Sequence, residues 1–410
     1  MLTGQKVKVE IAPVRQGIGL QSIALFVKTP VPSGLFFTQP ANCFIVPESS
    51  VRERAGYTIT KSMTTHPDLA PITRQLRAMY GSRLLVAAVH HIPVFDTLSN
   101  GPLSIRQLQD QLQLGERPAS VLFPALCAMN LLAYAPDGKL YITELGQYLT
   151  QHRATNLRGY VGLEKDDAGV VEMAARLRND GPLDTPDGIS FVKEGDEPSP
   201  MDDPLLSRQF TMGLAGRARQ LAPLVAARLP RRAGHLLDVA AGTGLYAYEW
   251  LLVNPAATAT ILDRPAVLAV AEELLDEFSR SDRPGAEQIR ERVTFRAGDM
   301  LTDALPEADI LLAASLFHDW PTPTCQCLAN RFATALRPGG ELWVHDAFLN
   351  DTLDGPLAVT DYSAALFWGT KGRCYSRAEY RSWLVQAGLE PVAETWPTQL
   401  DYSLIYARKR

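Results

Sequence analysis

After about residue 230 the sequence alternates between short apolar runs and stretches with helical spacing, and this order limits the possible folds more than any other feature. The parallel strands are predicted at 235–240, 258–262, 293–296, 309–314 and 341–344. Two further apolar runs, at 391–394 and 402–407, follow each other closely and predict a terminal antiparallel hairpin. Because strands that alternate with helices build parallel sheets covered on both faces, we expect a doubly wound α/β sheet.

The region before residue 151 has a helical pattern that ends in a small hairpin. Ser104 suits the start of a helix, Gly115 its end, and Pro118 the first turn of a second helix. Asp137-Gly138 then turns into a short strand at 139–142. Two helices and a small β-wing in this order predict a winged helix.

A winged helix suggests DNA binding, so the charge of this region has to be weighed. Between residues 104 and 150 the basic side chains do not outnumber the acidic ones, and the whole chain carries a formal net charge of -5. A recognition helix needs a basic face to contact phosphates. We therefore expect no nucleic-acid partner and assign this region to formation of a homodimer.

The length of 410 residues predicts at least two domains. We expect an N-terminal extension of unknown role at 1–70, a helical winged-helix dimerisation domain at 71–229, and the α/β domain at 230–410. The five cysteines are scattered, which favours a reduced, cytoplasmic protein. We expect no signal peptide and no membrane-spanning segment.

The strongest motif is the segment 237–244, which reads Leu-Asp-Val-Ala-Ala-Gly-Thr-Gly and joins a predicted strand to a predicted helix. Residues without bulky side chains let the backbone approach a ligand closely, while the free N–H groups of the helix face the same place. The segment also fits the dinucleotide pattern G-x-G-x-x-A, so a nicotinamide cofactor and an oxidoreductase remain an alternative.

Acidic residues near the ends of three strands favour S-adenosylmethionine over a dinucleotide. Asp238 precedes the small residues, where a dinucleotide loop usually has an apolar residue. Asp263 closes the next strand and is placed to accept hydrogen bonds from two ribose hydroxyls. Asp299 and Met300 follow the third strand, where they suit the amine and the face of an adenine. Their order and spacing predict an S-adenosylmethionine site.

With these motifs the sequence resembles the plant-type small-molecule O-methyltransferases and their bacterial relatives in natural-product pathways. The resemblance covers roughly residue 84 to the C-terminus. It rests on 238–244, Asp263-Arg264-Pro265, Gly298-Asp299-Met300, His318-Asp319-Trp320 and 336–340. It implies a Rossmann-like methyltransferase fold preceded by a winged-helix dimerisation domain, and an acceptor that is an aromatic or polyketide-like secondary metabolite.

The resemblance also implies roles for single residues. His318 corresponds to the family's general base, and Asp319 and Asp346 are its expected helpers. An imidazole suits this role, since its pKa of about 6.5 lets it take the proton of a phenol as the methyl group transfers. The expected cofactor contacts are Asp238, Ala240, Gly242, Gly244, Asp263, Arg264, Asp299, Met300 and Ser315. The expected acceptor contacts are Glu164, Phe210, Met212 and Phe367.

Three positions depart from the family pattern. Ala240 replaces the first glycine of the loop, Ala314 a common lysine, and Gly372 an acidic helper of the base. C-methylation, with Glu164 or Asp346 as the base, is therefore an alternative. An alternative of another class is a winged-helix regulator with a degenerate methyltransferase fold.

Two His-Asp pairs, His318-Asp319 and His345-Asp346, follow neighbouring strands, and together they would have the ligands for a metal site. Alternation along a strand would instead turn His345 and Asp346 to opposite faces, leaving only Asp346 beside His318. We expect the second arrangement and an enzyme without a metal ion.

Overall fold

The computed structural model describes residues 67–181 and 199–410. The predicted N-terminal extension therefore lies almost entirely outside the described residues. Within the described ranges, no helix combines the length and the apolar character needed to cross a bilayer.

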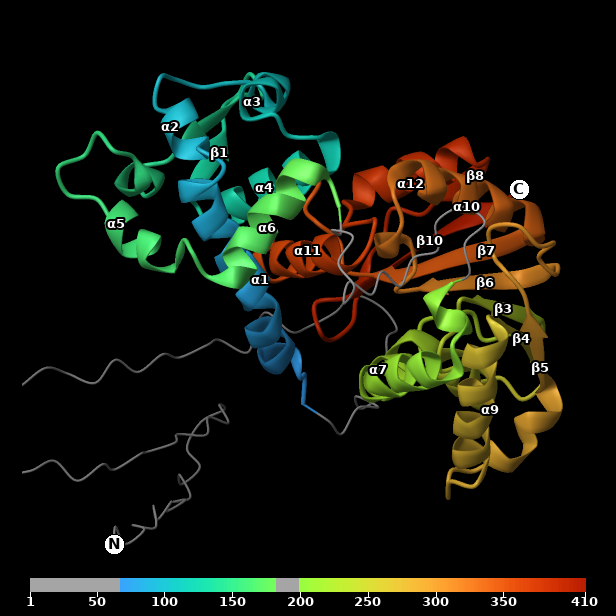
Figure 1. Ribbon diagram of the computed structural model, residues 1–410. Helices are drawn as coiled ribbons and strands as arrows, with labels where there is room; N and C mark the ends of the chain where they lie inside the picture. The colour runs from blue at the N-terminus through green and yellow to red at the C-terminus, as the bar shows by residue number, and fades with distance from the viewer. Residues whose placement is uncertain (1–66, 182–198) are drawn as a thin grey trace, which may run out of the picture. The chain divides into compact units, whose positions relative to one another are not determined.

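The first described part is mainly helical and has the predicted order of helix, helix and wing (Figure 1). Ser104 and Gln107 form a capping box at the start of α3 (Ile105–Leu112), which satisfies free N–H groups of its first turn. The wing strands β1 (Leu132–Tyr134) and β2 (Leu140–Ile142) pair antiparallel. The helices are α1 (Ala70–His90), α2 (Val94–Leu98), α3 (Ile105–Leu112), α4 (Glu116–Ala128), α5 (Arg158–Val161) and α6 (Ala168–Asn179).

The second part is built on one sheet with the strand order β5-β4-β3-β6-β7-β10-β8, and β9 pairs with β10. The strands β3 to β7 run parallel, and β10 pairs antiparallel with β7, so the predicted α/β fold with an antiparallel end is confirmed. The strands are β3 (His235–Val239), β4 (Thr258–Asp263), β5 (Val293–Ala297), β6 (Ala308–Ala314), β7 (Leu336–Asp346), β8 (Leu389–Pro391), β9 (Trp396–Pro397) and β10 (Ser403–Lys409).

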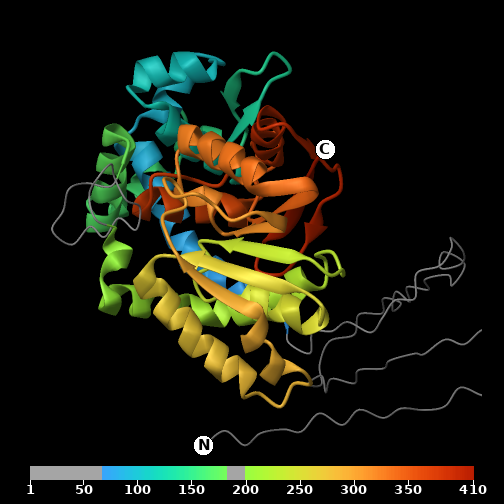
Figure 2. The same cartoon turned by 90° about the vertical axis from the view of Figure 1, so that its right-hand side faces the viewer.

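Helices cover both faces of this sheet (Figure 2). Successive strand residues point to opposite faces, so Leu236 enters the core under α7 and α8, whereas Leu237 enters the core under α10 and α12. The helices are α7 (Pro204–Ala226), α8 (Leu245–Val253), α9 (Pro265–Ser279), α10 (Thr322–Ala335), α11 (Leu357–Gly369) and α12 (Arg377–Gln386).

Helix α11 joins the two parts. It follows β7 in the sequence, yet it packs against α1 and α4 of the helical part (Figure 1). Its residues Ala364 and Phe367 are fully buried in the same apolar cluster as Leu84 and Leu122. The helical core is therefore completed by a segment that lies more than 200 residues further along the chain.

Candidate active site

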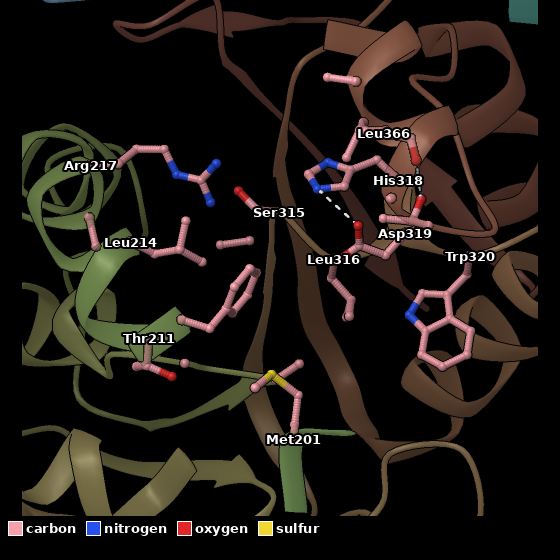
Figure 3. Close-up of a pocket in the computed structure, with 18 of the residues that line it drawn as sticks. Met201, Thr211, Leu214, Arg217, Ser315, Leu316, His318, Asp319, Trp320 and Leu366 are labelled. Atoms are coloured by element: carbon pink, nitrogen blue, oxygen red, sulfur yellow. Dashed lines mark hydrogen bonds and ion pairs between the residues drawn. The ribbon is translucent and has the colours of Figure 1, made fainter. Parts of the chain in front are cut away.

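A cavity of about 860 Å³ lies at the carboxyl ends of the central parallel strands, where α/β sheets bind their ligands. Its walls come from the loops after β3, β4 and β6, from α7 and from α11. Figure 3 shows the walls formed by α7, the loop after β6 and α11. This volume is at the upper end of the range for small-molecule sites, about 300–1,000 Å³, and offers room for two ligands together.

The small-residue loop after β3 forms one wall. Ala240, Gly242 and Gly244 have φ values of 51°, 56° and 69°, in the left-handed region. Ala240 and Gly242 line the cavity, and a Cβ atom on Gly242 would meet no atom within 4 Å, so its backbone is open to a ligand. Gly244 instead caps α8 beside Tyr248. The alanine at 240 adopts the conformation that the family's glycine favours, at a cost of about 1–2 kcal/mol.

Asp263 at the end of β4 faces the same wall. Its Oδ2 accepts a hydrogen bond from the Gly242 N–H at 2.8 Å, and its Oδ1 accepts one from the Arg264 N–H at 2.7 Å. Burial raises the pKa of Asp263 to about 6. Each carboxylate oxygen has a further lone pair for a ligand hydroxyl.

Asp238 lies beneath the loop, 1% exposed, and does not line the cavity. Burial and the neighbouring charge of Asp263 raise the pKa of Asp238 to about 8. Its Oδ2 has no hydrogen-bond partner among the described residues.

A smaller cavity of about 120 Å³ is lined by Asp263, Arg264, Asp299 and Met300, and Met300 also lines the large cavity. The Arg264 guanidinium contacts Asp299 at 3.3 Å and Asp202 at 2.6 Å. Asp299, expected to accept from an adenine amine, is thus held by an arginine.

Ser315 has a φ value of 53° in the loop after β6 and lines the large cavity. Its hydroxyl is buried and has no hydrogen-bond partner among the described residues. The cavity therefore has a free hydroxyl group on the wall nearest to His318 (Figure 3).

His318, in the same loop after β6, forms a buried pair with Asp346 at the end of β7. The His318 Nδ1 and Asp346 Oδ1 atoms are 2.5 Å apart. Asp346 also accepts from the Tyr380 hydroxyl at 2.8 Å and from the Ala347 N–H at 2.8 Å. Burial alone would raise the pKa of Asp346, but His318 and these hydrogen bonds lower it. The carboxylate is therefore fixed in its charged form against one ring nitrogen.

The other ring nitrogen of His318 is on the cavity side. Its Nε2 is 3.7 Å from Asp319 Oδ1 (Figure 3). The same nitrogen is 3.5 Å from the Tyr362 hydroxyl. Burial alone would lower the pKa of His318, but the carboxylates of Asp346 and Asp319 raise it above its usual value. The geometry thus offers a polarised imidazole with one nitrogen directed at the cavity.

His345 points away from this pair. Its ring lies between Tyr246 and Tyr402, its Nε2 is 2.9 Å from the Thr398 hydroxyl, and burial lowers its pKa to about 3. His345 and Asp346 thus lie on opposite faces of β7, as strand alternation predicts. Among the described residues no group of three or more histidine, cysteine or carboxylate side chains could hold a metal ion.

The expected acceptor contacts are only partly brought together. Phe210 lines the cavity, but Met212 packs instead against Val270 and Leu274 on the far side of α7. A spacing of two residues turns a helical side chain to the other face, which explains the difference. Phe367 is fully buried in the helical core, and Glu164 is exposed in the short helix η3 (Gly162–Glu164) outside the cavity.

Several residues of α7 and α11 that line the cavity were missed, among them Arg217 and Tyr362. Phe210, Leu214 and Arg217 recur at helical spacing on α7 and all line the cavity. On α11 the cavity face carries Tyr362 and Leu366. The spacing from Phe210 was the available signal for Arg217, whereas Tyr362 had none, because periodicity does not say which face of α11 meets the cavity.

Comparisons with known proteins identify the family of this chain. The O-methyltransferase domain family matches residues 201–390. A 3-hydroxy-5-methyl-1-naphthoate 3-O-methyltransferase of Streptomyces sahachiroi is 28% identical over 328 residues, which is 78% of this chain and 89% of the relative. The acetylserotonin O-methyltransferase of Bos taurus is 34% identical over 174 residues, 42% of this chain and 47% of the relative.

A solved structure extends the similarity to the helical part. An O-methyltransferase family 2 protein of Planctomyces limnophilus, in complex with apigenin, is 34% identical with a TM-score of 0.74. The match covers 86% of this chain and all of that one. With the cavity and its residues in place, the chain belongs to O-methyltransferase family 2 and is an O-methyltransferase that uses S-adenosylmethionine.

Proposed function

We propose that this enzyme methylates a hydroxyl group of an aromatic or polyketide-like secondary metabolite, with His318 as the general base. The observation that carries the proposal is the orientation of the His318 ring. Asp346 occupies the Nδ1 side, so the proton stays there and the Nε2 lone pair faces the cavity. The similarity to a naphthoate O-methyltransferase supports an aromatic acceptor.

The cofactor wall fits S-adenosylmethionine. Asp263 would accept the ribose hydroxyls, Met300 would contact the adenine, and the open backbone of Gly242 leaves space for close approach. The cofactor supplies a methyl group already activated by its sulfonium, so only the acceptor oxygen needs activation.

The base acts by removing the acceptor's proton. A phenol has a pKa of about 10, and the raised pKa of His318 brings the imidazole nearer to that value. Asp346 would fix the tautomer and stabilise the imidazolium that forms. The remaining acceleration would come from the cavity, which holds oxygen, methyl carbon and sulfur in line.

The departure at Gly372 has a steric reason. A Cβ atom at this position would overlap the backbone of His318 and Trp320, so a glutamate is incompatible with this loop. Asp319, at 3.7 Å from Nε2, supplies negative charge near the base instead. Neither carboxylate considered for C-methylation lines the cavity, because Asp346 is fully buried and Glu164 is at the surface. This favours O-methylation.

The proposal is tested by incubating the enzyme with S-adenosylmethionine and a set of hydroxylated aromatic compounds. We expect mass spectrometry to find products that gain one methyl group, and nuclear magnetic resonance to place that group on oxygen. Transfer only to carbon, or no transfer although S-adenosylhomocysteine binds, would refute the proposal.

We further propose a cytoplasmic homodimer whose interface is formed by the helical part of the predicted dimerisation domain, with α1, α5 and η3. Apolar side chains are exposed on α1, α5 and η3, with Leu76 66%, Tyr160 74% and Leu163 75% exposed. Exposed apolar surface of this kind is typical of association sites. The four described cysteines are free thiols, as expected in a reducing compartment. A monomer in light scattering at micromolar concentration would refute the dimer.

A further inference from the structure

Two arginines line the large cavity among the described residues, and they differ in their partners. Arg176 pairs with Glu172 at 2.5 Å and donates to the Trp368 carbonyl. Arg217 forms no ion pair with a described residue and donates from Nη1 only to the hydroxyls of Tyr402, at 2.9 Å, and Tyr362, at 3.4 Å. Its Nε and Nη2 have no hydrogen-bond partner among the described residues.

The charge of Arg217 is permanent. Burial alone would lower the pKa of Arg217, but the surrounding tyrosines raise it, so the guanidinium stays protonated. A positive charge inside a cavity costs free energy unless an anion or several hydrogen-bond acceptors meet it. In Figure 3 the guanidinium extends from α7 into the cavity toward Ser315. Among the described residues, the cavity therefore presents a buried cation that forms no ion pair and is held only by tyrosines.

Arg217 is also close to the base. The hydroxyl of Tyr362 lies between them, 3.4 Å from Arg217 Nη1 and 3.5 Å from His318 Nε2. A molecule whose hydroxyl contacts His318 thus has Arg217 within reach of a second group on the same ring system. Arg77, whose guanidinium lies 3.8 Å from the Tyr362 ring centre, adds positive charge behind this tyrosine.

We propose that Arg217 binds an anionic oxygen group of the methyl acceptor, so that the preferred acceptors are hydroxylated aromatic carboxylic acids. The carboxylate would take the free Nε and Nη2 donors of Arg217, while the hydroxyl to be methylated contacts His318. This inference rests on the proposed O-methyl transfer and adds the substrate class. The methionine carboxylate of the cofactor could bind Arg217 in the same way. The experiment must therefore distinguish an acceptor carboxylate from the cofactor's own carboxylate.

The test measures binding to enzyme loaded with S-adenosylhomocysteine, so that it does not depend on turnover. Calorimetry compares 3-hydroxybenzoate with 3-hydroxybenzamide, which has nearly the same shape without the charge. We expect the wild-type enzyme to bind the acid about 10- to 100-fold more tightly, as a charge-assisted pair allows. Arg217→Met should remove this preference, and Arg217→Lys should keep part of it.

Arg219→Met is the matched control, because Arg219 lies on the same helix but pairs with Glu277 outside the cavity, at 2.9 Å. It should keep the full preference for the acid. Equal affinity of the wild-type enzyme for acid and amide, or an unchanged preference in Arg217→Met, would overturn the inference. A tenfold loss of S-adenosylhomocysteine affinity in Arg217→Met, with the acid no better than the amide, would assign Arg217 to the cofactor's carboxylate instead. If no hydroxyl is methylated, the proposed function fails, but the binding preference still decides the role of Arg217.

Discussion

The two sides of the cavity are built in different ways. The proposed cofactor side comes from the ends of three strands that follow one another along the chain, and it presents mainly backbone together with Asp263. The acceptor side combines α7, the loop after β6 and α11, and it presents long side chains such as Arg217 and Tyr362. A ligand common to a whole family can be held by a local motif, whereas acceptor choice depends on how distant helices pack.

The largest effect is expected at the base, where the two sides meet. His318→Ala should lower kcat by about 10²–10⁴-fold, because the acceptor proton loses its base. The affinity for S-adenosylhomocysteine should stay unchanged, since the cofactor contacts are on the other side. Steady-state kinetics and calorimetry measure the two quantities. His152→Ala, at an exposed position, should leave both unchanged, and a His318→Ala enzyme with full activity would exclude His318 as the base.

On the cofactor side, Asp263→Ala should weaken S-adenosylhomocysteine binding by about 1.5–3 kcal/mol for each lost charge-assisted bond. Calorimetry measures the loss. Asp263→Asn keeps most of the side chain and serves as the check on folding, because the carboxylate also accepts from Gly242 and Arg264. Unchanged affinity in both variants would remove Asp263 from the cofactor site.

The pair at His318 predicts a pH effect. Burial lowers and the carboxylates of Asp346 and Asp319 raise the pKa of His318, with a net rise. A general base works only when unprotonated, so kcat/KM should fall as the pH drops through this pKa. Asp346→Asn should lower the pKa of His318 and move this fall to lower pH. A pH–rate profile measures the shift, and a shift to higher pH would contradict the assignment.

The smallest effects are expected from substitutions on the two opposite faces of α7. Phe210→Ala should raise the KM of the acceptor several-fold because it removes a cavity wall. Met212→Ala should leave KM unchanged and lower the free energy of unfolding by about 1 kcal/mol, since its side chain is only partly buried against Val270 and Leu274. Steady-state kinetics measures KM and denaturant unfolding measures stability for both variants. A raised KM in Met212→Ala with an unchanged KM in Phe210→Ala would mean that α7 is rotated.

Sequence patterns predicted the sheet and the cofactor because both depend on local order. Strand alternation separated His345 from Asp346, and the segment 237–244 marked the loop that lines the cavity. The roles of the single residues remain predictions. Phe367 was wrongly expected in the cavity because α11 packs against helices from a distant part of the chain. Glu164 was wrongly expected there because the short helix η3 ends at Glu164 and a separate helix, α6, begins after Asp167.

The position of α11 also means that sequence boundaries and folding units do not coincide in this enzyme. A chain cut near residue 230 would leave Ala364 and Phe367 without the neighbours that bury them. The separated α/β half would then expose an apolar helix face and lose order in one wall of its own cavity. A chimaera between relatives should therefore exchange α1, α4 and α11 together, because these three helices share one apolar core.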